Sequence, residues 1–399
     1  MIGRERVLVV GRPIDLSDVP FDAFVERHGR FIELLREHFD VCLLGLRDVG
    51  DSTVVSGRWS ALPYREVTIE RAESSRRRRV LDAVHAGRDG NIDPWERDLV
   101  GAAATLDPHA VITLGPWLNR EYRSLHERYP SVHLFEEDLS RMRELAPQSP
   151  QARALRRLVV SIESRSTRQP IAACYLARQE AHGVRRRHPT AEAVYLPYTL
   201  DPQNWPIAAT PVSGSGVVVV GNLSQFRNAE GLAEMLDMVS GLAQHPLHGV
   251  RVISDAGLHP CLTNHVQSGL LRHLPGQDVA TCYQSAAIAL VPAKRLTGLK
   301  TTVLQAWAMG CPVVGFSATA QSVGATATSM RSGDTAAQVL GHIEDLMQFP
   351  QQRTESALAG FDMLRDHFED RRVQHDFLSV VRSALSTRQP ALHPTSSRS

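Results

Sequence analysis

The stretch that decides the fold runs from residue 279 to residue 315 and reads VATCYQSAAIALVPAKRLTGLKTTVLQAWAMGCPVVG. Within it, Ala287–Val291 has the length and the unbroken apolar character of a buried strand in a parallel sheet. A short polar loop follows, and a helix is predicted over Thr301–Met309, with Gly310 in the position that commonly ends a helix. The run Pro312–Phe316 then predicts the next strand. This order of strand, helix and strand predicts a parallel α/β unit with a right-handed crossover.

The loop inside this unit is a candidate anion site. It contains Gly298 and Lys300, and it lies between the carboxyl end of a predicted strand and the amino end of a predicted helix. Ligands bind at such strand ends in open α/β sheets, and the free N–H groups and dipole of the helix favour a phosphate there. Thr301 and Thr302 would add hydroxyl donors. The same pattern also occurs where a glycine only joins a strand to a helix, so this loop alone leaves both interpretations open.

A second loop, upstream, has the same character. The run Val217–Val220 predicts the first strand of the same domain, and Gly221 and Asn222 follow it directly. Arg227 lies six residues after the glycine. Two strand ends on one edge of a sheet would converge on one anion, with Arg227 and Lys300 supplying positive charge from two sides. We therefore expect a diphosphate site built from both loops.

The order of these motifs resembles the C-terminal domain of GT-B-fold glycosyltransferases, especially the retaining family 4 group. Members of that group carry G-[R/S]-L with a basic residue downstream, then Y-x-x-[AS]-D-[VI]-x-[VL]-x-P, then G-x-x-x-x-x-L-E-A-[MW]-A-x-G-x-P-V-V. This chain has Gly221 and Leu223, then Tyr283–Pro292 with Ala287 in place of the aspartate. The run Gly298–Val314 matches the last motif. The resemblance covers roughly residues 216–350 and implies that this domain binds a nucleotide sugar.

Two glutamates of the family 4 group, eight positions apart, are replaced in this chain. Thr297 stands where the group has a glutamate near the transferred sugar, and Gln305 where it has one that accepts hydrogen bonds from the ribose. Gln305 keeps an acceptor oxygen, so nucleotide binding should survive. Thr297 cannot place a negative charge beside an oxocarbenium-like centre, so the departing diphosphate or another group must stabilise that centre. The resulting expectation assigns Thr297 to the catalytic site and nine residues to donor binding: Gly221, Asn222, Arg227, Gly298, Leu299, Lys300, Thr301, Thr302 and Gln305.

The length of the chain, 399 residues, exceeds the usual size of one hydrophobic core and favours two domains. The stretch 201–216, DPQNWPIAATPVSGSG, is too rich in Pro, Gly and Ser for a continuous helix or strand. We predict an acceptor-binding domain at 1–200, a linker at 201–215, a nucleotide-sugar-binding domain at 216–385 and a disordered tail at 386–399. The predicted fold class is α/β, with two Rossmann-like, doubly wound domains facing each other across a cleft.

Alternating strands and helices support this architecture in both halves. Further strands are predicted at Arg6–Val10, Val41–Leu46, Ala110–Leu114, Ser131–Phe135, Ala193–Leu196 and Arg251–Ile253. Further helices are predicted at Phe21–His38, Gln151–Glu163, Ile171–His182 and Glu230–Leu242.

Candidate acceptor-side residues lie in the first half. The long loop that follows the first strand is expected to end at His28 and Gly29 and to face the cleft. A neutral imidazole titrates near pH 7, so His28 could act as general base, with a plain surface histidine as the alternative. Trp117 and Asn119 follow another predicted strand, and Trp117 could either stack on a sugar ring or pack in the core.

Glu137 belongs to the acidic run Glu136–Asp138 at the end of a predicted strand. Clustered oxygens can bind a hard cation, but three adjacent side chains cannot all face one ion. We therefore expect Glu137 to orient an acceptor hydroxyl or amine, and we expect no metal site.

Composition and charge exclude several classes of protein. The net charge of +1 gives no overall field that would hold the chain on nucleic acid or on an anionic bilayer. Five cysteines occur singly, an odd number without a CxxC pair, which indicates a reducing compartment. No stretch reaches the roughly 20 apolar residues of a membrane span. We expect a cytoplasmic protein with no cofactor beyond a nucleotide-sugar co-substrate; the acceptor stays unidentified, and a homodimer is an open possibility.

The resemblance implies a glycosyltransferase that moves a sugar from a nucleotide diphosphate sugar to an acceptor hydroxyl or amine, with retention at the anomeric carbon. The loss of both glutamates leaves a second hypothesis open, a GT-B-fold binding or scaffold protein without transfer activity. A GT-B-fold epimerase would need carboxylate acid and base groups in the cleft. The loss of both motif glutamates therefore disfavours this third hypothesis.

Overall fold

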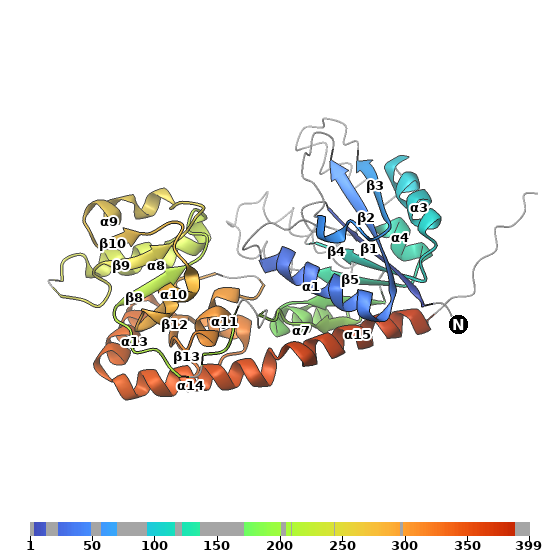
Figure 1. Cartoon of the computed structure of the whole chain (residues 1–399). Helices are drawn as coiled ribbons and strands as arrows, with labels where there is room; N and C mark the ends of the chain where they lie inside the picture. The colour runs from blue at the N-terminus through green and yellow to red at the C-terminus, as the bar shows by residue number, and fades with distance from the viewer. Residues whose placement is uncertain are drawn as a thin grey trace, which may run out of the picture. The chain divides into compact units, whose positions relative to one another are not determined.

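The computed structural model describes residues 4–12, 23–48, 57–69, 94–115, 122–135, 171–200, 205–208, 210–242, 244–295 and 298–387 (Figure 1). Internal contacts divide the chain into two units. The first comprises the chain up to Leu176, Glu180–Leu196 and the chain from Gln374 onward, and the second comprises Ala177–Gln179 and Pro197–Val373. No helix in these residues is both long and apolar enough to cross a membrane.

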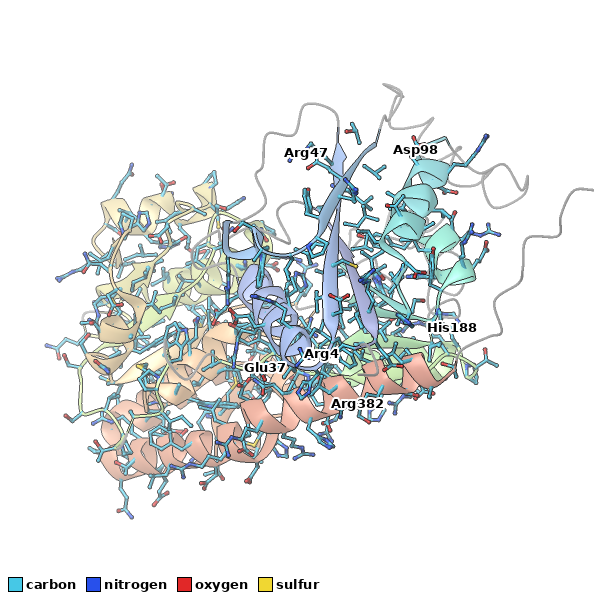
Figure 2. All side chains as sticks on the ribbon, turned by 45° about the vertical axis from the view of Figure 1, so that its right-hand side comes forward. Arg4, Glu37, Arg47, Asp98, His188 and Arg382 are labelled. Carbon is cyan, nitrogen blue, oxygen red and sulfur yellow. The ribbon has the colours of Figure 1, made fainter. Side chains whose placement is uncertain are left out.

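The first unit is built on a parallel sheet. Seven strands of the described chain pair in the order β3-β2-β1-β4-β5-β6-β7, so the direction of winding reverses between β1 and β4 (Figure 1). Arg47, which Figure 2 labels, lies on β2 beside the edge strand β3. It donates from Nε and Nη2 to the two carboxylate oxygens of Glu66 on β3, at 2.7 and 2.8 Å. The strands are β1 Arg6–Gly11, β2 Asp40–Asp48, β3 Tyr64–Ile69, β4 Ala110–Leu114, β5 Ser131–Phe135, β6 Ala172–Tyr175 and β7 Ala193–Tyr195.

Helices flank this sheet because the strands are apolar on both faces. The strands β1, β4, β5 and β6 are buried almost throughout, as expected for parallel strands covered on both sides. The described helical elements of the first unit are α1 Ala23–His38, η2 Gly57–Trp59, α3 Pro94–Leu106, α4 Arg123–Arg128 and the greater parts of α7 Arg178–Arg187 and α15 Asp370–Ser386.

The second unit repeats the architecture. Six described strands pair in parallel in the order β10-β9-β8-β11-β12-β13, with the winding reversed between β8 and β11. The strands are β8 Val217–Val220, β9 Val250–Ile253, β10 Leu271–His273, β11 Ile288–Val291, β12 Val313–Phe316 and β13 Met330–Gly333. The helical elements are α8 Phe226–Val239, η3 Pro260–Leu262, α9 Thr263–Gln267, α10 Val279–Gln284, α11 Thr301–Ala308, α12 Ser317–Val323, α13 Ala336–Gln348 and α14 Pro350–His367. The prediction of two doubly wound α/β domains is confirmed.

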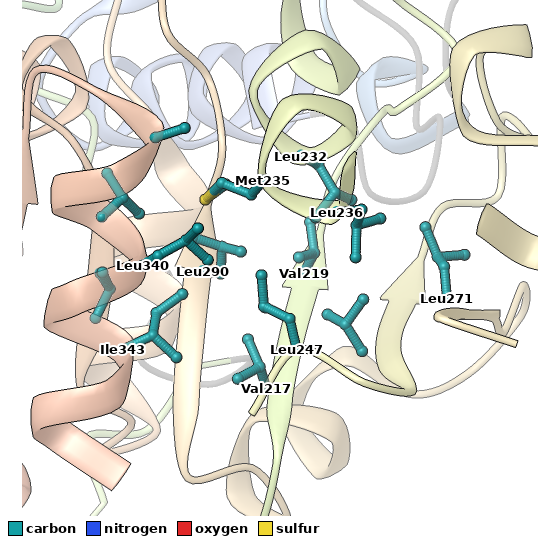
Figure 3. Packing of buried hydrophobic residues seen from close by; sticks show 14 of the residues in the cluster. Val217, Val219, Leu232, Met235, Leu236, Leu247, Leu271, Leu290, Leu340 and Ile343 are labelled. Carbon is teal, nitrogen blue, oxygen red and sulfur yellow. The ribbon is translucent and has the colours of Figure 1, made fainter. Parts of the chain in front are cut away.

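One face of the second sheet packs against α8 and α13 (Figure 3). Alternate strand residues, such as Val217 and Val219, point to this face, because side chains of a strand alternate between its two sides. Leu236 of α8 and Ile343 of α13 are fully buried in the same cluster. This core holds the helix that follows β8 firmly on the sheet.

Two close approaches set the positions of α8 and α11. A Cβ added at Gly231 of α8 would lie 2.2 Å from the carbonyl oxygen of Pro292, the residue that follows β11. A Cβ at Gly360 of α14 would lie 2.4 Å from the indole of Trp307 in α11. Trp307 is fully buried and donates from Nε1 to the carbonyl oxygen of Ser329 at 3.0 Å. The close packing of α8 and α11 against their neighbours therefore requires glycine at positions 231 and 360.

Several predicted elements need correction. The predicted helix Ile171–His182 is wrong, because Ala172–Tyr175 forms the buried strand β6 between β5 and β7, and α7 begins only at Arg178. An alanine-rich run favours a helix locally, but pairing with two neighbouring strands overrides that preference. The helix predicted over Glu230–Leu242 begins earlier, at Phe226. The predicted helix Gln151–Glu163 lies outside the described residues.

The last helix corrects the predicted domain limits. Residues up to 385 were assigned to the second domain, whereas the chain from Gln374 onward belongs to the first unit. The reason is packing, since Phe377 stacks on Phe31 of α1 with ring centroids 4.2 Å apart. The units meet in sequence at Leu196 and Pro197, and the described part of the predicted linker has no regular secondary structure.

Candidate functional site

The candidate site of the second unit lies where its sheet reverses direction. Strands β8 and β11 are neighbours in register, with Ile288 opposite Val217 and Ala289 opposite Val218. Their carboxyl ends therefore lie side by side, and the two glycine loops predicted to bind an anion leave from adjacent strands. Such a switch point is the usual ligand-binding crevice of a doubly wound sheet.

The loop after β8 has a fixed shape. Gly221 has φ +137°, a backbone conformation that L side chains rarely adopt, and its N–H donates to the carbonyl oxygen of Ile253 at 3.1 Å. Asn222 Oδ1 accepts from the backbone N–H and the hydroxyl of Ser224, at 3.1 and 2.6 Å. A Cβ at Gly221 would lie 3.9 Å from Thr302 Cγ2. The two predicted loops thus come together at Gly221 and Thr302.

Asn228 joins the two loops through its side chain. Its Nδ2 donates to the carbonyl oxygen of Asn222 at 2.8 Å, and its Oδ1 accepts from Lys300 Nζ at 3.0 Å. Arg227, beside it in the first turn of α8, is exposed and donates from Nε to Gln225 Oε1 at 3.0 Å. Asn228 was not predicted as a site residue, although a side-chain amide in the first helical turn after a glycine loop could have indicated it.

Two further cations after β11 are paired with carboxylates of α8. Lys294 Nζ lies 2.5 Å from Glu234 Oε2, and Arg295 Nη2 lies 2.8 Å from Glu230 Oε2. The two glutamates are four residues apart and so share one face of the helix. This face fastens the beginning of the β11–α11 loop to α8.

The amino end of α11 follows this loop. Gly298 has φ +68°, Lys300 is the N-cap residue, and Thr301 and Thr302 form the first turn. N–H groups of a first helical turn have no partner within the helix, so they are available to a ligand. Buried Tyr283 donates from its hydroxyl to the carbonyl oxygen of Thr302 at 3.1 Å, and burial raises its pKa well above the ordinary value. This hydrogen bond therefore anchors the first turn of α11 to the protein interior.

The structure brings most of the predicted donor-site residues to this one edge. Gly221, Asn222 and Arg227 come from the β8 side, and Gly298 to Thr302 come from the β11 side. Gln305 lies one turn further along α11 and is partly exposed. The helix prediction over Thr301–Met309 is confirmed, and Gly310 ends the helix with φ +70° as predicted. Thr297 lies outside the described residues.

The prediction that His28 and Gly29 end a loop on the acceptor side is wrong. His28 and Gly29 do not belong to a loop, because both lie within α1 and are buried. Burial, and secondarily the charge of Arg27, lowers the pKa of His28 to about 3. A Cβ at Gly29 would lie 3.1 Å from Arg58 Nη1, so this glycine lets the η2 segment pack on α1. The amphipathic pattern of α1 turns His28 inward, and we propose no role for it as a base.

The other acceptor-side predictions, Trp117, Asn119 and Glu137, lie outside the described residues. Within the described ranges, no group of three or more His, Cys, Asp and Glu side chains could hold a metal ion.

One part of the chain is similar in sequence to a known protein family. Residues 214–348, about a third of the chain, match the family described as Glycosyl transferases group 1. The matched region contains both glycine loops and all of α11. No curated protein sequence matches the chain.

Solved structures extend the likeness to nearly the whole chain. Sucrose-phosphate synthase from Thermosynechococcus elongatus is similar with a TM-score of 0.73 and 12% identity, over 96% of this chain and 100% of that one. The chain has the GT-B glycosyltransferase fold. Anabaena HepE in complex with UDP has a TM-score of 0.65 at 11% identity, over 95% of this chain and 100% of that one. The lipopolysaccharide outer core galactosyltransferase WaaB has a TM-score of 0.66 at 10% identity, over 95% and 99%. At 10 to 12% identity, these structures show a shared fold, and the family match is confined to the second unit.

Proposed function

We propose that the protein transfers a sugar from a nucleotide diphosphate sugar to a hydroxyl or amine of an acceptor, with retention at the anomeric carbon. The observation that carries this proposal is the link at the switch point, where Asn228 ties Lys300 to the loop of Asn222. It joins two glycine loops at adjacent strand ends and keeps a cation beside a helix start. Positive charge and free N–H groups at one point are what a diphosphate requires.

The donor class follows from the same chemistry. Arg227 and Lys300 supply charge from the two loops, and the first turn of α11 supplies N–H groups. Gln305, further along α11, offers an amide oxygen to a ribose hydroxyl. Anabaena HepE, which shares the fold, has been solved with UDP and with UDP-glucose. We extend to this chain only the class, a nucleotide diphosphate sugar, and leave its base and sugar open.

In the proposed reaction, the bond between the anomeric carbon and the diphosphate oxygen breaks, and its electron pair stays on the diphosphate. The acceptor oxygen or nitrogen bonds to the anomeric carbon on the same face, and the acceptor proton passes to the departing diphosphate. Arg227, Lys300 and the α11 N–H groups stabilise the charge that develops on the leaving group. This scheme uses side chains and backbone alone to bind the diphosphate, without a metal ion or a further cofactor, and the acceptor is assigned to the first unit.

A second candidate function is nucleotide-sugar binding without transfer. The observation that favours it is the neutral Gln305 on α11, together with Thr297 in the sequence, at the two positions where the family 4 group has glutamates. Without a carboxylate near the anomeric carbon, an oxocarbenium-like centre is less stabilised. Both functions require the same donor site, so the two are separated only by chemistry on the bound donor.

The test is isothermal titration of the full chain with UDP, GDP and dTDP, followed by mass spectrometry of the corresponding nucleotide sugars for hydrolysis or transfer. Arg227→Ala and Lys300→Ala should each weaken binding of the nucleoside diphosphate by about 10- to 100-fold, the range for a charge-assisted hydrogen bond. Arg365→Ala is the matched control, because Arg365 is exposed on α14 and its nearest carboxylate, Asp362, is 3.8 Å away. Unchanged affinity in both site variants would refute the donor site; binding without any turnover would favour the second function.

A further inference from the structure

Three basic residues follow β11 in the described chain before α11, and α8 holds them in two different ways. Lys294 and Arg295 meet the carboxylates of Glu234 and Glu230. Lys300 meets the side-chain amide of Asn228. A carboxylate cancels the charge of the cation it pairs with, whereas an amide oxygen holds an ammonium group and leaves its charge in place. The helix thus pairs two of these cations with carboxylates and the third with a neutral amide.

The orientation of the Asn228 amide is determined by its partners. The carbonyl oxygen of Asn222 can only accept, so it faces the Nδ2 group, and the Lys300 ammonium can only donate, so it faces Oδ1. The backbone N–H of Asn228 donates to the carbonyl oxygen of Gln225 at 3.0 Å, which fixes the residue in the first turn of α8. Both ends of the amide are thereby engaged, and the side chain can hold Lys300 in one place.

We infer that Asn228 is a positioning residue, which orients the Lys300 ammonium toward the donor diphosphate without neutralising it; this rests on the proposed function. Asn228 acts through Lys300 and need not touch the nucleotide. This role requires a neutral residue at position 228. An aspartate of the same size would keep the contact with Lys300 but would cancel the charge of the ammonium group. A charge introduced there would also repel the diphosphate directly.

The experiment measures the affinity of the full chain for UDP, GDP and dTDP, and for the three nucleosides without phosphate, in the wild type, Asn228→Asp and Asn228→Ala. For the nucleoside diphosphate that binds, Asn228→Asp should weaken affinity by about tenfold or more, and Asn228→Ala by less. Affinity for the matching nucleoside should stay within about twofold, since the base and ribose contacts do not involve this residue. Asn264→Asp is the matched control, because it makes the same chemical change at an exposed residue of α9 and should leave the preference for the diphosphate unchanged.

A double-mutant cycle separates positioning from a general structural effect. In a Lys300→Ala background, Asn228→Ala should have no further effect on diphosphate affinity, because the residue it orients is gone. Equal losses for diphosphate and nucleoside, or additive losses in the cycle, would overturn the inference. Wild-type-like affinity of Asn228→Asp would also overturn it while leaving the proposed function intact. If the wild type binds none of the three diphosphates, the proposed function itself fails, and the inference fails with it.

Discussion

Thr113 Oγ1 lies 2.6 Å from His133 Nδ1 and 3.0 Å from His126 Nε2, so one hydroxyl bridges two imidazoles inside the first unit. All three side chains are buried, on β4, β5 and α4. A hydroxyl has one proton to donate, so one imidazole must accept from it and the other must donate to it when both are neutral. Protonation of the accepting imidazole would break this arrangement.

The first prediction is that the first unit loses stability in mild acid. Burial lowers the pKa of His28 and His126 to about 3 and that of His133 well below its ordinary value. Below about pH 6.5 the unfolded chain takes up protons on these histidines while the folded chain does not, so stability falls as pH drops from 6.5 toward 3. Within that window, each such histidine lowers the free energy of unfolding by about 1.4 kcal/mol for each pH unit of acidification.

Hydrogen exchange followed by mass spectrometry at pH 7.5, 6.0 and 5.0, corrected for intrinsic rates, checks this prediction. Peptides from β4 and β5 should lose protection more steeply than peptides from β12 and β13. His126→Gln should reduce the slope, because one titrating imidazole is gone. Equal slopes in the two units would contradict the assignment.

A second prediction concerns the close approach of α8 to the β11 loop. Gly231→Ala should destabilise the protein by about 2 kcal/mol or more, although alanine is the better helix former, because its Cβ would lie 2.2 Å from a backbone oxygen. Affinity for the nucleoside diphosphate should fall as well, because Pro292 begins the loop that leads to Lys300. Urea unfolding and titration calorimetry measure the two effects.

Gly341→Ala provides the matched control within α13. A Cβ there has nothing within 4 Å, so the same substitution should raise the free energy of unfolding by about 0.5 to 1 kcal/mol. If both variants shift stability in the same direction, contact with Pro292 is not what requires glycine at position 231.

A third prediction concerns Gln305. Under the proposed function, Gln305→Glu should tighten binding of the nucleoside diphosphate and of the nucleoside alike by about three- to tenfold, because hydrogen bonds to a charged acceptor are roughly twice as strong. Gln321→Glu, an exposed residue of α12, is the control for added negative charge. Weaker binding in Gln305→Glu would show that this side chain does not face the ribose.

A fourth prediction concerns the last helix. Phe377 is fully buried and stacked on Phe31, so Phe377→Ala should cost the first unit about 3 to 5 kcal/mol. Ser379→Ala, on the exposed side of α15, should be nearly neutral. Chemical unfolding should show the loss in the transition of the first unit, and a loss below about 1 kcal/mol would mean that α15 does not anchor there.

Much of the fold was predictable because it depends on local patterns. Continuous apolar runs indicated strands such as Ala110–Leu114 and Val217–Val220, which the structure has with the same limits. The short strands β10 and β13 were missed because three or four partly polar residues carry no clear periodicity. Strand β6 was missed because its alanines favour a helix until neighbouring strands pair with them.

The sequence by itself determined two doubly wound domains and the place of the candidate site, because glycine loops at strand ends and the pattern of Gly298–Val314 are local features. Only the tertiary structure decided which side chains meet there. Asn228 and Lys300 are 72 positions apart in the chain and come together because β8 and β11 are neighbours in the sheet. The same long-range packing buried His28 and brought the chain from Gln374 onward into the first unit. Such pairings depend on how distant elements pack, which the periodicity of a single segment does not contain.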